Sequence, residues 1–430
     1  MGSTIFEIHT VHADTAIQFA SSPNPVGSGA RAIGMGGAFI AIADDATAAS
    51  WNPGGLFQVG GMEFSIVNYS FHRLENIAPG EISGIEGHET ISKNQWNYFS
   101  FSYPFSLFDR YMVISLNKQH LFDFNRKWDF SYFIKDKTDP INQVEFHADI
   151  NYDQKGSLSA IGLAYSVQII KQLAFGFTLN FWDDDLCHNK WTEKSSVSNG
   201  YAQMTIPEMP TPIIFPLEDT ISKDEYTFDG FNINIGVLLK PFQNPLRIGI
   251  VYKSSVKGDL YHQQTEDKIT RQMQKEMKLP MSFGLGLSYE FSDAFRVSAD
   301  FYQTNWQDFS ITDTNGNQFS PITKKALNAS DINATHQVRM GAEYLLINKE
   351  KNTIIPVRAG IFYDPGPSEN TPDHYFGYTV GSGIAFGKYI FDMAFQHRIG
   401  NNVGDSMVQG YDFSMDVSEY MVFGSLIVYL

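Results

Sequence analysis

The side chains of this chain that could serve a function are apolar. They suggest non-covalent binding of a hydrophobic molecule. Residues 184–225 hold a stretch rich in methionine and isoleucine that four prolines interrupt. In residues 265–278 apolar side chains recur at every fourth position, which predicts one stripe along a helix. The residues expected to bind substrate are Met204, Ile206, Ile213, Ile214, Phe215, Ile269, Met273 and Met277.

Apolar side chains at the tips of loops that should face water require a partner. The sequence leaves two possibilities open for segments 184–225 and 258–279. They pack on each other as a lid, or they also leave an apolar groove in which a hydrophobic ligand first binds.

Enzymatic and metal chemistry have little support in the sequence. The chain contains neither a G-x-S-x-G nor an H-E-x-x-H motif, and its histidines lack the spacing of metal ligands. Cys187 is the single cysteine, which excludes a disulfide framework and a cysteine-cluster metal site. The net charge of −16 argues against a nucleic-acid partner. We therefore expect no enzyme activity, cofactor, metal or nucleic acid.

The elements that must position the apolar residues alternate apolar and polar side chains. Residues 173–181, 281–291 and 389–395 each place apolar side chains on one face and small or polar ones on the other. Charged residues are only 18% and aromatic residues 14%, yet no apolar run is long enough for a membrane helix. About fourteen such segments predict an all-β protein, a transmembrane antiparallel β-barrel.

Residues 30–56 lack this alternation and are rich in glycine and alanine, so they make a poor barrel wall and a good plug. We expect residues 1–58 to form an N-terminal segment and hatch inside a barrel of residues 59–430. Charged residues on the inward faces either seat this plug by ion pairs or simply line a wet lumen. The hatch residues expected to matter are Arg31, Gly34, Gly36, Gly37, Asp44, Asp45, Asn52, Pro53 and Gly54.

The first residues do not look like an intact signal peptide. They have neither a basic n-region nor an apolar core of 7–15 residues. We expect the mature protein to begin near Ala13 to Ala16.

Residues 30–56, ARAIGMGGAFIAIADDATAASWNPGGL, resemble the hatch signature of the FadL/TodX outer-membrane channels for long-chain fatty acids and aromatic hydrocarbons. The similarity continues through residues 279–306, 336–346 and 355–368. It implies a hatch inside a fourteen-stranded barrel in the bacterial outer membrane, working as a monomer among lipid and lipopolysaccharide. Substrate would land between segments 184–225 and 258–279, enter an apolar pocket and leave sideways beside a kinked third strand.

Two positions depart from the family pattern. The Asn-Pro-Ala hatch motif corresponds to Asn52-Pro53-Gly54, with glycine in place of alanine. The expected third strand, residues 110–120, contains no glycine, so a kink and lateral gate would lie near Asn117 and Lys118.

The sequence thus favours a passive importer of hydrophobic small molecules, either long-chain fatty acids or aromatic and aliphatic hydrocarbons. The alternative is a non-transporting barrel that serves as a scaffold or attachment partner in protein secretion. Apolar, methionine-bearing loops favour the importer, because a docking scaffold needs no apolar groove.

Overall fold

The structure, a computed structural model, describes residues 22–24, 26–78, 87–136, 143–207, 209–241, 245–266, 269–405 and 414–430. The expected mature start near Ala13 to Ala16 lies outside these residues. Among the described residues, no helix has the length and apolar character needed to cross a membrane.

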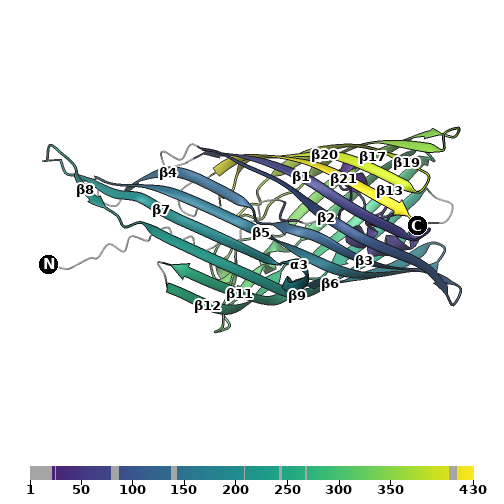
Figure 1. Cartoon of the computed structure of the whole chain (residues 1–430), viewed down its shortest axis with the longest axis horizontal. Helices are drawn as coiled ribbons and strands as arrows, with labels where there is room; N and C mark the ends of the chain where they lie inside the picture. Colours follow the sequence, from purple (N-terminus) through teal and green to yellow (C-terminus); the bar gives the residue numbers. More distant parts are fainter. Residues whose placement is uncertain are drawn as a thin grey trace.

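A closed barrel dominates the molecule (Figure 1). Each strand pairs antiparallel with the next, and β21 returns to β1, where Val428 lies opposite Phe64. The described residues supply fourteen wall strands, which confirms the predicted number. In order around the wall they are β1 (Glu63–Ala78), β2 (Gly87–Leu107), β3 (Arg110–Asp123), β5 (Gln143–Ile170), β6 (Leu173–Trp182), β9 (Thr220–Leu239), β10 (Leu246–Lys253), β13 (Ser282–Ser292), β14 (Phe295–Thr304), β17 (Thr335–Asn348), β18 (Thr353–Tyr363), β19 (Tyr375–Phe386), β20 (Tyr389–Val403) and β21 (Ser414–Tyr429).

The alternation of side chains fixes which face each strand turns outward. Along β6 the small and polar residues at even positions are buried, and the leucines and phenylalanines at odd positions are more exposed. Phe283 on β13 and Phe391 on β20 are about 40% exposed on the outer wall. The predicted arrangement, apolar outward and polar inward, is the pattern of a membrane barrel.

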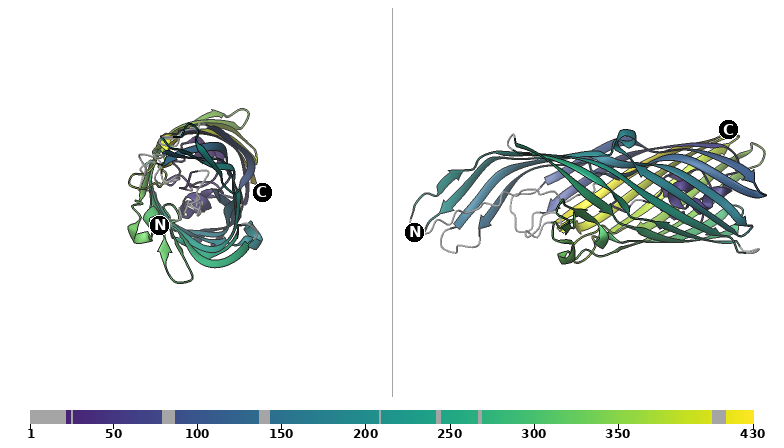
Figure 2. Two further views of the ribbon diagram at one scale, coloured as in Figure 1. Left: turned by 90° about the vertical axis from the view of Figure 1, so that its left-hand side faces the viewer. Right: turned by 90° about the horizontal axis from the view of Figure 1, so that it is seen from below.

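Among the described residues, five further strands form an extension that rises beyond the closed barrel on one side (Figure 2). The upper halves of β5 and β9 continue into it and carry the added strands between and beside them. These strands are β4 (Arg126–Asp136), β7 (Lys190–Thr205), β8 (Ile213–Pro216), β11 (Val256–Glu266) and β12 (Ile269–Leu279). Two short strands, β15 (Ser310–Thr312) and β16 (Gln318–Phe319), lie in the connection between β14 and β17. The short helix α3 (Asp184–Cys187) joins β6 to β7.

The extension corrects two predictions. Residues 265–278 were expected to be helical, but β12 pairs with β11 along its whole length. Side chains four residues apart share a face in a strand as well as in a helix, so the spacing alone could not separate the two. Most of segment 184–225, expected to be a loop, is likewise strand, and its prolines interrupt pairing only around β8.

An inner segment, residues 29–58, lies within the ring of strands (Figure 2, left). It contains α1 (Ala30–Gly34), α2 (Ala48–Trp51) and the 3₁₀ helix η1 (Pro53–Gln58). Helix α1 contacts β19 and β20, whereas η1 contacts β5, β6 and β9 on the other side. Nearly all its side chains are buried, including Phe39 and Trp51.

Candidate functional site

The inner segment is held against the wall by close backbone contacts that require glycine. Gly36 has a φ of 70°. A Cβ atom there would lie 2.7 Å from the carbonyl oxygen of Met340. Its N–H donates to Thr379 Oγ1 at 2.9 Å, and that hydroxyl donates to the carbonyl of Gly34 at 3.0 Å. Gly37, with a φ of 74°, continues the turn.

The contacts of the Asn52-Pro53-Gly54 turn explain why residue 54 is glycine here and not alanine, as in the family pattern. Asn52 Nδ2 donates to the carbonyls of Ile40 and Val237, and Asn52 Oδ1 accepts from the Gly54 N–H at 3.0 Å. A Cβ atom on residue 54 would lie 2.7 Å from the backbone of Gly236 on β9. Glycine at this position therefore lets the turn touch the wall.

Ion pairs connect the inner segment to the inward charges of the wall. Arg31 pairs with Asp44 at 2.6 Å and with Glu343 of β17 at 3.1 Å. Glu343 also pairs with Arg358, and Asp44 reaches Arg296 at 3.3 Å. Asp45 lies 3.6 Å from Arg31 and accepts from the Thr47 hydroxyl. The inward charges of Glu343, Arg296 and Arg358 are thus linked to the inner segment, directly or through one another.

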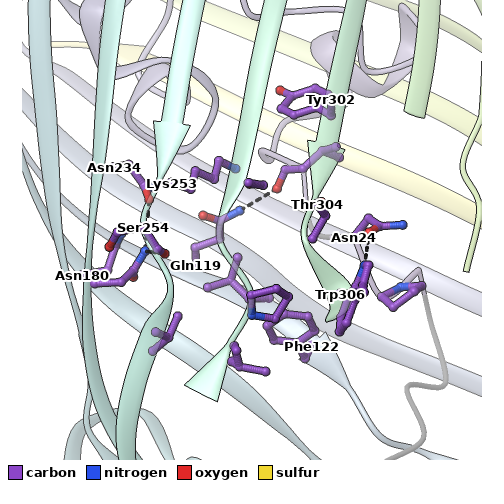
Figure 3. Close-up of a pocket in the computed structure, with 18 of the residues that line it drawn as sticks. Asn24, Gln119, Phe122, Asn180, Asn234, Lys253, Ser254, Tyr302, Thr304 and Trp306 are labelled. Carbon is purple, nitrogen blue, oxygen red and sulfur yellow. Dashed lines mark hydrogen bonds between the residues drawn. The ribbon is translucent and has the colours of Figure 1, made fainter. Parts of the chain in front are cut away.

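A cavity of about 70 Å³ lies in the lumen where β10 meets β11 and β12 meets β13. We call it the lysine cavity (Figure 3). Its apolar side is formed by Phe122, Trp182, Val256, Leu279, Pro280 and Trp306. Its polar side carries Lys253 with the amides of Asn180, Asn232 and Asn234. Among the described residues no carboxylate forms an ion pair with Lys253. The cavity therefore presents a cation, amide donors and aromatic surface together.

A second cavity, of about 100 Å³, lies beside β2 and β3. We call it the seam cavity. It is lined by Tyr69, Asn97, His120, Leu121 and Phe423, among others. Asn24, Val26, Gln119 and Leu121 line both cavities. Gln119 Nε2 donates to the Val26 carbonyl at 3.1 Å, so this hydrogen bond lies between the two spaces.

The wall has an incomplete seam next to this second cavity. Pairing of β2 with β3 ends at Tyr98 and Gln119. Register irregularities follow immediately, at Asn97 against β1 and at Leu121 against β5. Beyond them, among the described residues, β2 pairs only with β1, and β4 only with β5.

Side chains rather than backbone bridge this seam. Lys93 pairs with Asp123 at 3.2 Å. Gln95 Nε2 lies 2.9 Å from His120 Nε2 and donates to Asp123 at 3.1 Å. Higher up, Glu89 accepts from the Asp129 N–H at 2.9 Å.

The position predicted for a kink must be corrected. Asn117 and Lys118 are paired regularly on both sides, with Ser100 and Phe99 of β2 and with Gly162 and Ile161 of β5. The irregularity lies at Leu121 instead. A bulge needs one unpaired residue rather than a glycine, so the absence of glycine gave no information about its place.

The residues predicted to bind substrate do not face one another across a single groove. Ile213, Ile214 and Phe215 lie in β8, whereas Ile269, Met273 and Met277 lie in β12. The sheet order β8–β7–β9–β11–β12 places three strands between them. Neighbouring strands are about 4.8 Å apart, so the two sets are separated by about 19 Å across the sheet.

Their exposure also differs. Met277 is 1% exposed and packs in the apolar cluster with Leu279, a residue of the lysine cavity. Ile269 is 62% exposed and Ile214 59%. Met204 pairs with Ile213 near the end of β7, and Ile206 follows that strand.

Sequence reasoning missed the residues of the lysine cavity. Asn232 and Asn234 alternate with apolar residues in β9, a signal of inward-facing amides that was available. Lys253 ends an apolar strand and looks like an ordinary strand terminus. Trp306 and Asn24 come from distant parts of the chain, and only the fold brings them together.

Comparison with known proteins supports this architecture. Residues 16–401 match the family described as outer membrane protein transport protein (OMPP1/FadL/TodX). No curated protein matches the sequence.

Solved structures share the fold at low identity. A FadL homologue of Pseudomonas aeruginosa is 13% identical, with 94% of this chain and 98% of that chain covered and a TM-score of 0.61. The toluene transporter TbuX of Ralstonia pickettii is 12% identical, with 95% and 99% covered and a TM-score of 0.54. The toluene transporter TodX of Pseudomonas putida is 13% identical, with 94% and 98% covered and a TM-score of 0.51. The chain belongs to the FadL/TodX family of outer-membrane transport proteins, and it is a transport channel rather than an enzyme.

Proposed function

We propose that this channel carries hydrophobic molecules with an anionic end, long-chain fatty acids above all, passively across the outer membrane. The observation that carries the proposal is Lys253 in the lysine cavity. Lys253 is partly buried, and even partial removal of an ammonium from water is costly unless an opposite charge accompanies it. A substrate carboxylate would supply that charge and accept charge-assisted hydrogen bonds.

The aromatic side of the same cavity suits the remainder of such a molecule. Trp182, Phe122 and Trp306 would contact an alkyl chain, and each buried CH₂ group contributes about 0.8 kcal/mol. A purely hydrocarbon substrate would gain this apolar contact but would leave the Lys253 ammonium without an opposite charge. This difference favours the acid over an alkane or an arene.

We propose release through the seam between β2 and the β3–β4 side. The leading segment, residues 22–28 apart from Pro25, would move away and join the two cavities. Opening the seam would break only contacts that involve a side chain, since among the described residues no strand pairing joins β2 to β4. Trp96, 57% exposed on the outer wall beside the irregularity, is of the type that marks a membrane interface. We therefore place the release point at the outer leaflet.

The same proposal assigns the hatch. Residues 1–58 would form the N-terminal segment and hatch, and residues 59–430 the barrel. The extension would be the extracellular end, because the opposite end has short turns such as Phe108-Asp109, as periplasmic ends do. A barrel closed by its own strands needs no second copy, which supports a monomer surrounded by lipid and lipopolysaccharide.

Replacement of Lys253 by methionine tests the substrate class. Lys253→Met should weaken binding of a fluorescent long-chain fatty acid to purified channel in micelles, while toluene binding stays unchanged. Lys257→Met, an exposed lysine four residues further on, is the matched control and should change neither. Equal fatty-acid affinity in Lys253→Met and wild type, with a normal heat-modifiable gel shift, would contradict the anionic substrate.

The scaffold alternative keeps one supporting observation. Ile214, Phe215 and Ile221 near the tip of the extension are each at least 47% exposed and lie away from both cavities. If they serve attachment, Ile214→Ser with Phe215→Ser should abolish co-purification of a secreted partner and leave fatty-acid binding intact. Loss of fatty-acid binding in that variant would assign the tip to ligand capture instead.

A further inference from the structure

A cap folds over the extension end of the barrel. It comprises residues 305–334 between β14 and β17, with the 3₁₀ helices η2 (Trp306–Asp308) and η3 (Leu327–Ala329) and strands β15 and β16. Its buried apolar residues pack in one cluster with the inward face of the extension, including Trp191, Tyr226 and Met277. The cap residues of that cluster are Trp306, Phe309, Ile311, Ile322 and Ile332.

The cap is attached to the wall at its edges. Strand β15 pairs with β12 over three residues, from Ser310 to Thr312. On the other side Ile332 forms an isolated bridge with Glu369, and Lys325 pairs with the same glutamate. Asn333 Nδ2 donates to the Asn370 carbonyl at 3.4 Å. These contacts hold the cap without involving the leading segment.

One residue of the leading segment holds both ends of the cap. Asn24 is 2% exposed, and its Oδ1 accepts from Trp306 Nε1 at 2.7 Å (Figure 3). The same oxygen accepts from Thr335 Oγ1 at 3.1 Å. Trp306 lies at the start of the cap, and Thr335 follows its last residue. The Asn24 Nδ2 group donates to the Pro365 carbonyl at 2.6 Å and to Asp364 Oδ1 at 3.3 Å. The amide thus uses both N–H groups and both lone pairs of its oxygen.

Asn24 also lines both the lysine cavity and the seam cavity. A displacement of the leading segment that joins the cavities must therefore remove Asn24 from the two donors at the cap ends. Conversely, a cap that lifts must withdraw the Trp306 donor from Asn24. In either case buried polar groups lose their partners, which is costly.

We infer that Asn24 interlocks the cap with the leading segment, so that the two segments open together and not separately. The interlock is a conformational property of the protein without ligand, so it stands or falls independently of the substrate proposed above.

Hydrogen exchange of the ligand-free channel in micelles tests the interlock. Trp306→Phe keeps the aromatic packing and removes one donor to Asn24. Its cap amides, residues 305–334, should exchange faster, and the amides of residues 26–28 in the leading segment should accelerate by a similar factor, of about tenfold for one buried hydrogen bond. Asn333→Ala is the matched control, since it loosens the cap without touching Asn24, and it should accelerate the cap alone.

Acceleration confined to the cap in Trp306→Phe would overturn the interlock. Thr335→Val removes the second donor with little change of shape and serves if Trp306→Phe does not fold. The same two outcomes then apply: joint acceleration supports the interlock, and acceleration of the cap alone refutes it.

Discussion

At the scale of the residue, backbone segments that lie in close contact require particular residue types, which the composition of the chain does not reveal. Gly54 lies against Gly236 of β9, and Asn52 hydrogen-bonds to two carbonyls and to the Gly54 N–H. The sequence identified this turn from Asn-Pro-Gly-Gly, but the reason for glycine in place of alanine required the partner strand.

Gly54→Ala should therefore destabilise the folded channel. The added methyl group would lie 2.7 Å from backbone atoms, and overpacking of this kind costs about 1–3 kcal/mol. Urea unfolding in lipid vesicles measures the loss. Gly60→Ala, where no atom lies within 4 Å of the added Cβ, is the control and should unfold as wild type does. Equal stability of the two variants would contradict the close seating of the turn.

A second residue-scale prediction concerns Glu193 in the extension. Its Oε1 accepts from Gln154 and Trp191, its Oε2 has no hydrogen-bond partner among the described residues, and the residue is 2% exposed. Burial raises the pKa of the Glu193 carboxyl from 4.5 to about 8, and the charge of Asp224 adds to the shift. The folded state therefore holds this proton at pH values where the unfolded chain has lost it.

The sign of the pH dependence follows from linkage. The contribution of Glu193 to the free energy of unfolding is largest below pH 4.5 and falls as pH rises to about 8. Glu193→Gln should flatten the stability profile over this window relative to wild type. Parallel profiles in thermal unfolding from pH 4.5 to 8 would show that Glu193 is charged in the folded state.

At the scale of the element, the wall could be predicted and the extension could not. Strands such as β6 alternate over ten residues, and only a two-residue period explains that pattern. In β12, Ile269, Met273 and Met277 fit a strand face and a helix stripe equally well. The lysine cavity was beyond reach of the sequence because β6, β9, β10, β14 and the leading segment each contribute to it.

Exposed aromatic residues on different elements should respond differently to charge. Phe391 on β20 is 44% exposed on the barrel wall, and Tyr261 on β11 is 47% exposed on the extension. Phe391→Arg should cost about 2–4 kcal/mol because it places a cation in the bilayer. Tyr261→Arg should change stability by about 0.5 kcal/mol or less, as for an ordinary water-facing site. Equal costs in vesicle unfolding titrations would mean that the membrane boundary is misplaced.

The seam makes a prediction about release. Cysteines replacing Gln95 and His120, whose side chains touch across the seam, can be joined by a bifunctional thiol reagent with a reducible spacer, and this link should stop uptake until a reductant is added. The control pair replaces Ser100 and Asn117, which are already register partners below the seam, and linking it should leave uptake unchanged. Full uptake through the cross-linked Gln95/His120 variant would remove the seam from the route.

At the scale of the whole molecule, the barrel wall is closed and its lumen is occupied. The strands close on themselves (Figure 1), the inner segment is buried in the lumen, and the cap packs against the inward face of the extension. A route straight along the barrel axis would have to displace the ion pairs of Arg31 and the Asn52 turn. A route from the lysine cavity to the seam requires movement of the leading segment and of the cap linked to it, but leaves those ion pairs and the turn in place, and this difference favours sideways release.

Photolabelling in lipid vesicles with a long-chain fatty acid that carries a diazirine at its tail tests this route most directly. We expect adducts at the lysine cavity, on Phe122 or Trp306, and at the seam, on Leu121 or Trp96. Adducts on Phe57, Gln58 or Lys240, at the far end of the inner segment, would mean passage along the barrel axis and would contradict sideways release.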